Sequence, residues 1–179
     1  MNLDYNEEYK SFEKEVQDFC KQYKDISFSD RAKIPFSAKG GRNKNTIKRS
    51  DWQKILIEKG YFARSVPKKY GGYGGETDIL KSRIIASEFS KFKIPTPMGG
   101  QGIDMLVPTL LELGTEQQKE KYIKPTLHGE MIWCQGYSEP NAGSDLASLQ
   151  TKAELVNGEW VINGQKTVSY THLTLPTTD

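Results

Sequence analysis

The spacing of apolar residues changes near Met131, and this change limits what the chain can fold into. From Tyr9 to Phe19 and onward, apolar side chains recur every three or four residues, which is the period of one helix face. After Met131 they alternate with polar residues, which is the period of a strand. The sequence therefore predicts an α+β protein. An N-terminal all-α helical domain (1–129) is followed by an incomplete antiparallel β-barrel-like domain (130–179).

Apolar stripes and chain breakers predict five helices in the first part. By residue number they are 6–24, 51–59, 78–94, 102–113 and 116–127. A loop from Ile26 to Arg49 separates the first two and is strongly basic toward its end. Pro108 should kink the fourth helix or mark its true start, because proline is tolerated only in a first turn.

Three of these helices carry a residue that is typical of an N-cap. Ser50 with Gln53, and Thr115 with Gln118, have the spacing of a capping box, in which two side chains satisfy two backbone amides reciprocally. Thr77 stands where it could cap the third helix.

The last part of the chain predicts an antiparallel meander. Strands over 148–156 and 159–162 flank Asn157-Gly158, which is the strongest short hairpin signal. Asn163-Gly164 makes a second turn, and 165–167 should begin a further strand.

A predicted strand over 131–138 leads into a polar bend. Pro140 stops the pairing because it has no amide proton, and residues 141–145 are types that turns use. One interpretation is a solvated turn. The other is a cofactor cradle in which Gly143 allows close approach of a phosphate and Ser144 donates its hydroxyl. Two carboxylates of this bend, Glu139 and Asp145, favour turn roles over an acid–base pair.

The run from Gly136 to Asp145, GYSEPNAGSD, closely resembles the flavin-binding signature of the acyl-CoA dehydrogenases. Members of that family carry Ser or Thr before Glu-Pro, then Gly-Ser-Asp or Gly-Thr-Asp, at this separation. Tyr137 replaces a smaller aliphatic residue of many relatives. Three further stretches, 52–75, 114–130 and 162–166, are similar to family segments in the same order.

The resemblance implies FAD as cofactor and an acyl-CoA as substrate, with electron-transfer flavoprotein as acceptor and a homo-oligomer for a complete member. The cofactor-binding residues that it implies are Gln135, Gly136, Tyr137, Ser138, Gly143 and Ser144. Ser144 is also the position near the substrate. No catalytic residue is expected in this chain, since the family's glutamate base belongs to a C-terminal region.

The expected function is therefore an FAD-dependent acyl-CoA dehydrogenase-type oxidoreductase, inactive by itself. Two alternatives stay open: a non-catalytic helical module that binds acyl-CoA or a protein, and a flavin monooxygenase or nitroalkane oxidase of the same fold. The tail 168–179 departs from the family pattern, which favours a truncated dehydrogenase whose last residues come from a frameshift or misassembly.

Composition excludes several other classes of function. Twenty-five Lys and Arg against 23 Asp and Glu give a formal charge of +2, too small for nucleic-acid binding. No apolar run approaches the ~20 residues of a membrane helix, so a cytoplasmic protein is expected. Cys20 and Cys134 are expected to be buried free thiols, and His128 and His172 lack metal-ligand spacing.

Overall fold

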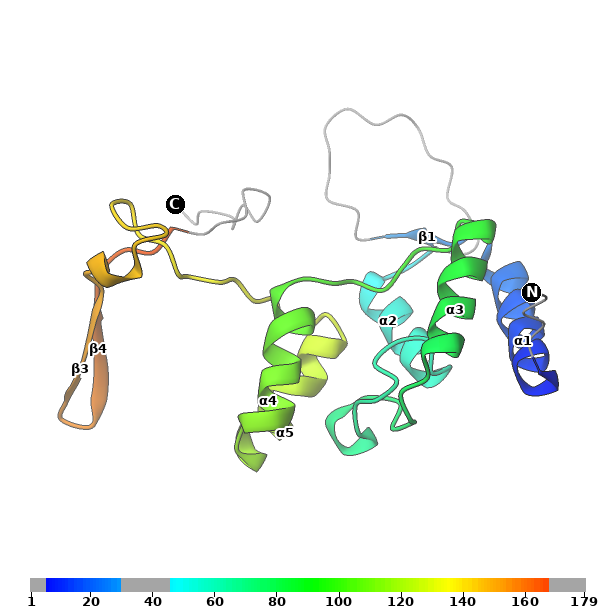
Figure 1. The fold of residues 1–179 in the computed structure, drawn as a ribbon, viewed down its shortest axis with the longest axis horizontal. Coiled ribbons are helices and arrows are strands. Elements are labelled where there is room, and N and C mark those ends of the chain that lie inside the picture. Colours follow the sequence, from blue (N-terminus) through cyan, green and yellow to red (C-terminus); the bar gives the residue numbers. More distant parts are fainter. Residues whose placement is uncertain (1–5, 30–45, 168–179) are drawn as a thin grey trace. The chain divides into compact units, whose positions relative to one another are not determined.

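The computed structural model describes residues 6–29 and 46–167, and the chain forms two compact units, Met1–Ile132 and Trp133–Asp179 (Figure 1). The described part of the first unit holds five α-helices and a short parallel strand pair. The second holds one antiparallel hairpin. None of the described helices is long and apolar enough to cross a membrane.

The main elements follow the predicted order. The helices are α1 (Glu7–Tyr23), α2 (Arg49–Glu58), α3 (Ile79–Phe92), α4 (Val107–Leu113) and α5 (Glu116–Leu127). The strands are β1 (Ser27–Phe28), β2 (Thr46–Ile47), β3 (Lys152–Val156) and β4 (Glu159–Asn163). Between them lie the 3₁₀-helix η1 (Lys68–Tyr70), the π-helix η2 (Gly102–Leu106) and the 3₁₀-helix η3 (Leu146–Ser148).

An aromatic cluster holds α1, α2 and α3 together. Phe19 stacks on Trp52 and on Phe89, with ring centroids 5.7 and 6.0 Å apart, and meets Tyr61 edge-on at 5.0 Å. All four side chains are at least 94% buried. Because each such ring removes a large apolar area from water, this cluster is the principal core of the helical unit.

A second buried cluster joins α5 to α4 and to the segment after α2. Its buried members are Ile57, Val66, Tyr70, Val107, Ile123 and Leu127. Phe62 packs against this cluster and against the aromatic one, so the two cores are continuous.

The predicted capping box at Ser50 is wrong. Helix α2 begins at Arg49, its N-cap is Lys48, and no side chain caps it. Gln53 is fully buried instead: its amide group donates to the Leu127 carbonyl at 3.0 Å and accepts from the Met98 amide at 2.8 Å. The Gln53 side chain is therefore engaged in tertiary hydrogen bonds and is not available for the capping box.

The other caps differ in outcome. Thr115 and Gln118 form the predicted capping box at the start of α5. Helix α3 is capped by Asp78, whose carboxylate accepts from the Lys81 amide at 2.9 Å, and not by Thr77. Asp is at least as good an N-cap as Thr, and the adjacent residue takes the role.

The predicted fourth helix consists of two pieces. The π-helix η2 comes first, and α4 follows with Pro108 in its first turn. Pro108 therefore marks the true start of the α-helix, which is one of the two outcomes expected for it.

The glycine-rich run before α3 is a compact turn. A Cβ at Gly72 would lie 2.2 Å from the Val66 carbonyl oxygen, so only glycine fits there. The amides of Gly74 and Gly75 donate to the carbonyls of Val66 and Arg64, each at 2.8 Å. Since these amides have protein acceptors, the run is structural and offers no phosphate cradle.

The hairpin β3–β4 turns at the predicted Asn157-Gly158, with Ala153 opposite Ile162 and Leu155 opposite Trp160. These four residues share one side of the hairpin, the apolar hairpin face, because side chains alternate along a strand. All four are exposed. The expected barrel is not shown: among the described residues from 133 onward, this hairpin is the sheet that forms.

Two further strand predictions are wrong for this structure. Residues 131–138 and 165–167 are extended or irregular, without ladder pairing. Strands persist only where a neighbouring backbone supplies hydrogen bonds, and here one backbone–backbone bond, from the Thr167 amide to the Ser138 carbonyl at 2.7 Å, joins the two segments. Cys134 is exposed, contrary to the prediction, whereas Cys20 is buried.

Candidate functional site

A tight, closed turn separates the two halves of the signature. The Glu139 amide donates to the Ala142 carbonyl at 2.8 Å, and the Ala142 amide donates back to Glu139 at 3.1 Å. Pro140 and Asn141 form the exposed tip, and Ala142 is buried beneath it. The turn places the predicted cofactor residues 135–138 before it and Gly143 and Ser144 directly after it.

The backbone amides on both sides of this turn have no acceptor among the described residues. This holds for Tyr137 and Ser138 before the turn and for Gly143 and Ser144 after it. A backbone amide without a protein acceptor is free to donate to water or to a ligand. These four amides are therefore available to a ligand that carries carbonyl or phosphate oxygens.

Glycine at position 143 is predicted to allow close approach of a phosphate. Its backbone does not have the left-handed conformation, so no positive φ requires glycine here. A Cβ at this position would meet nothing within 4 Å. Close approach of a ligand therefore remains the predicted reason for glycine here.

The predicted site residues differ in exposure. Ser138 and Gln135 are half-buried, while Gly136, Tyr137, Gly143 and Ser144 are exposed. Both Ser138 and Ser144 thus keep a hydroxyl that a ligand can reach, and the 63% exposed Tyr137 ring lies in solvent.

Glu139 accepts hydrogen bonds through both oxygens of its carboxylate. Its Oε2 accepts from the Gln150 amide at 2.7 Å, and its Oε1 accepts from the Thr151 amide at 2.9 Å. Lys166 Nζ lies 3.0 Å from Oε1, and the Glu139 side chain is only 7% exposed. Hydrogen bonding by Thr151 first, then by Gln150 and Lys166, lowers the pKa of Glu139 to about 2.

These contacts suit Glu139 to a structural role and not to that of a proton-abstracting base. A general base needs a pKa near the working pH, and both oxygens of this carboxylate already accept hydrogen bonds. The backbone carbonyl of Asp145 accepts from the Ser148 hydroxyl at 2.9 Å, a contact that does not involve its carboxylate. The turn role of the Asp145 side chain therefore stays a prediction.

Sequence reasoning missed the contacts of Lys166. Its Nζ donates to the Tyr137 carbonyl at 3.1 Å as well as pairing with Glu139. The signal that could have indicated them is the position of Lys166 in segment 162–166, which is similar to a family segment. From the sequence alone, Lys166 is assigned only to the start of a strand.

Elsewhere, the described residues offer a different kind of concavity. A cavity of about 760 Å³ lies in the helical unit beside α3, and both apolar side chains such as Phe62 and Phe89 and charged ones such as Asp78 line it. None of the predicted site residues lines it. No group of three or more potential metal ligands occurs within the described residues.

Comparison with known proteins identifies the family of the helical unit. The family model described as "Acyl-CoA dehydrogenase, N-terminal domain" matches residues 6–130. The chain is 39% identical over 126 residues to acyl-CoA dehydrogenase IpdE1 of Mycobacterium tuberculosis. This alignment covers 70% of this chain and 32% of the relative. It is 43% identical over 100 residues to the short-chain specific acyl-CoA dehydrogenase of Clostridium acetobutylicum, covering 55% and 26%.

A longer match includes the signature. Acyl-CoA dehydrogenase FadE29 of M. tuberculosis is 29% identical over 166 residues, covering 93% of this chain and 40% of that protein. Among solved structures, the ChsE4–ChsE5 complex of M. tuberculosis matches with a TM-score of 0.56 and 26% identity, over 93% of this chain and 39% of the other.

The chain thus spans about a third of the length of the curated relatives that it matches first. The N-terminal domain match alone covers well over half of the 179 residues. The chain belongs to the acyl-CoA dehydrogenase family.

Proposed function

We propose that this chain supplies the flavin-edge donors of an FAD-dependent acyl-CoA dehydrogenase. The observation that carries the proposal is the set of unpartnered amides on either side of the Glu139–Ala142 turn, within a run that resembles the family's flavin signature. Relatives named as acyl-CoA dehydrogenases support the same reading.

FAD, when bound, supplies the hydride acceptor for the oxidation of an acyl-CoA thioester to the α,β-unsaturated product. The residues of this chain bind and orient that cofactor. The amides of Tyr137 and Ser138, with the Ser138 hydroxyl, donate toward the oxygens at the ring edge and stabilise negative charge there.

Gly143 and Ser144 have the second binding role. Because Gly143 has no side chain, phosphate oxygens can come within hydrogen-bonding distance of the backbone. The exposed Ser144 hydroxyl donates to the same region, where the resemblance also places the acyl-CoA substrate. The base that removes the α-proton lies outside this chain by the same resemblance.

The test is an FAD titration of the purified chain, followed by quenching of flavin fluorescence. We expect Gly143→Val to weaken binding at least about tenfold by blocking close approach of the ligand. The fold should be unaffected, because a Cβ at this position meets nothing within 4 Å. Ser138→Ala should cost about 0.5–1.5 kcal/mol, one side-chain hydrogen bond.

Ala153→Val is the control, since it places a valine side chain at an exposed strand position away from the turn. It should bind FAD as the parent does. Absence of FAD binding by the parent, or equal affinity for parent and Gly143→Val, would contradict the proposal.

A further inference from the structure

Residues 166–167 contact three consecutive residues of the signature. Lys166 Nζ donates to the Tyr137 carbonyl at 3.1 Å, and the Thr167 amide donates to the Ser138 carbonyl at 2.7 Å. A Cβ at Gly136 would lie 3.3 Å from the Lys166 Cβ, so the lysine stem runs against the glycine backbone. Residues 166–167 therefore contact three consecutive positions of the segment that should bind the flavin edge.

The same lysine reaches the far side of the turn through Glu139. That carboxylate joins the Lys166 ammonium to the amides of Gln150 and Thr151, which lie directly before β3. One ion pair thus connects three parts of the unit: the signature, the residues that enter the hairpin and the residues that leave it.

The ammonium of Lys166 already has two protein oxygens within 3.1 Å, and its side chain is 31% exposed. A cation in this setting is better suited to fixing backbone than to binding the flavin pyrophosphate, because its charge is balanced by a buried carboxylate.

From these contacts we propose that Glu139 and Lys166 are positioning residues for the cofactor. Lys166 holds the Tyr137 carbonyl and is itself held by Glu139, so that the segment from Gly136 to Ser138 keeps one conformation and its amides remain available to a ligand. The inference rests on the proposed function, because it assigns the ligand as the flavin edge. Neither residue contacts the flavin itself.

The pair should reduce the free-energy cost of binding. A loop that is already ordered in its bound conformation loses less conformational freedom when the ligand arrives. Removing either partner also leaves the other as a poorly compensated charge in a partly buried place, which loosens the segment further.

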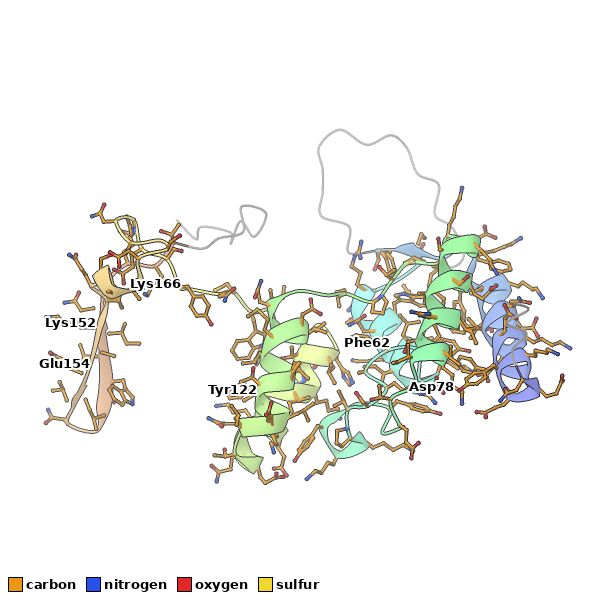
Figure 2. All side chains as sticks on the ribbon, in the orientation of Figure 1. Phe62, Asp78, Tyr122, Lys152, Glu154 and Lys166 are labelled. Atoms are coloured by element: carbon orange, nitrogen blue, oxygen red, sulfur yellow. The ribbon has the colours of Figure 1, made fainter. Side chains whose placement is uncertain are left out.

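The test combines two substitutions with two controls. Glu139→Gln keeps the shape but removes the charge, and Lys166→Met keeps the stem but removes the ammonium. Glu154→Gln and Lys152→Met make the same chemical changes on the exposed hairpin, where Figure 2 shows both side chains apart from Lys166. Lys166→Arg is the conservative rescue.

Two readouts are needed for each variant of the full chain. The first is hydrogen exchange at the amides of Gln150, Thr151 and Thr167, measured against amides within the hairpin ladder. The second is the FAD dissociation constant from flavin fluorescence. A merely structural contact would change exchange and overall stability but leave the affinity of the folded fraction unchanged.

We expect Glu139→Gln and Lys166→Met to speed exchange at these amides and to raise the FAD dissociation constant about tenfold, the size of one charge-assisted hydrogen bond. Both controls should stay within about twofold, and Lys166→Arg should recover most of the affinity.

Faster exchange with parental FAD affinity would overturn the positioning role. Unchanged exchange would overturn the contacts themselves. If the parent chain fails to bind FAD, the titration of the parent alone contradicts the proposed function, and the positioning role fails with it. The exchange data would then show only that the pair stabilises the fold.

Discussion

Gln53 connects three segments of the helical unit through one fully buried amide. It lies on α2, donates to Leu127 at the end of α5 and accepts from Met98 in the connection after α3. Both partners are backbone groups far away in sequence. A buried polar side chain is stable only when such partners exist, so this residue helps to fix where the connection after α3 lies.

Gln53→Leu is therefore expected to destabilise the helical unit by about 2–4 kcal/mol, because it leaves two backbone groups without a partner. Urea unfolding followed by circular dichroism measures the change. Gln117→Leu, on the exposed side of α5, is the matched control and should lie within about 0.5 kcal/mol of the parent. A Gln53→Leu midpoint equal to the parent's would show that these hydrogen bonds add nothing.

Single residues also show what sequence can and cannot reveal. Thr115 with Gln118 and Ser50 with Gln53 have the same capping-box spacing, yet only the first pair forms it. The spacing of residues in the sequence shows which local hydrogen bonds are possible. Whether a side chain is available for them depends on partners that lie far away in the sequence, such as the Leu127 carbonyl for Gln53. The tertiary partners of Gln53 and Lys166 could not be predicted for this reason.

At the scale of elements, local signals were reliable and pairing signals were not. The Asn157-Gly158 hairpin formed as predicted, because its turn residues determine it locally. The strand expected over 131–138 did not form, although alternation was present, because a strand needs a neighbour. The turn between the two halves of the signature was predicted from Pro140 and Asn141; its closure by Ala142 was not.

The stability of the Glu139–Ala142 turn should fall in acid because Glu139 becomes protonated. Its folded-state pKa is about 2, below its ordinary 4.5, because amide and ammonium donors stabilise the carboxylate. A lowered pKa contributes stability that is fully present above pH 4.5 and is lost as pH falls toward 2. The pH dependence should disappear in Glu139→Gln.

Carboxyl NMR of Glu139 across this range measures the effect directly, and the Gln150 and Thr151 amide shifts should follow the same curve. A titration midpoint near 4.5 would mean that the carboxylate is not held by these donors in solution.

At the scale of the whole molecule, family membership rests mainly on the helical unit, whereas the proposed chemistry rests on the second unit. Helical periodicity made the first predictable, since each stripe finds its core within the same 132 residues. The barrel was expected from the resemblance and from alternation, but the described strands β3 and β4 do not build one.

We expect the 179-residue chain by itself to show no acyl-CoA-dependent bleaching of flavin absorption. Both oxygens of Glu139 already accept hydrogen bonds, so among the described residues of the signature this carboxylate does not serve as the base, and lack of general-base catalysis typically costs about 10²–10⁴-fold in rate. Anaerobic spectra of chain, FAD and an acyl-CoA measure this. Stoichiometric bleaching would show that some other carboxylate of the chain acts as the base.

The apolar hairpin face has a consequence for spectroscopy. Trp160 on this face is 68% exposed, whereas Trp52 in the aromatic cluster is only 2% exposed. An indole in water emits at longer wavelength than one enclosed by apolar side chains, so Trp160 contributes at longer wavelength than Trp52, with the half-buried Trp133 as the third emitter. A partner that covers the apolar hairpin face should shift the Trp160 emission to shorter wavelength and protect Trp160 from quenching by iodide. Trp160 fluorescence therefore reports whether that face is covered.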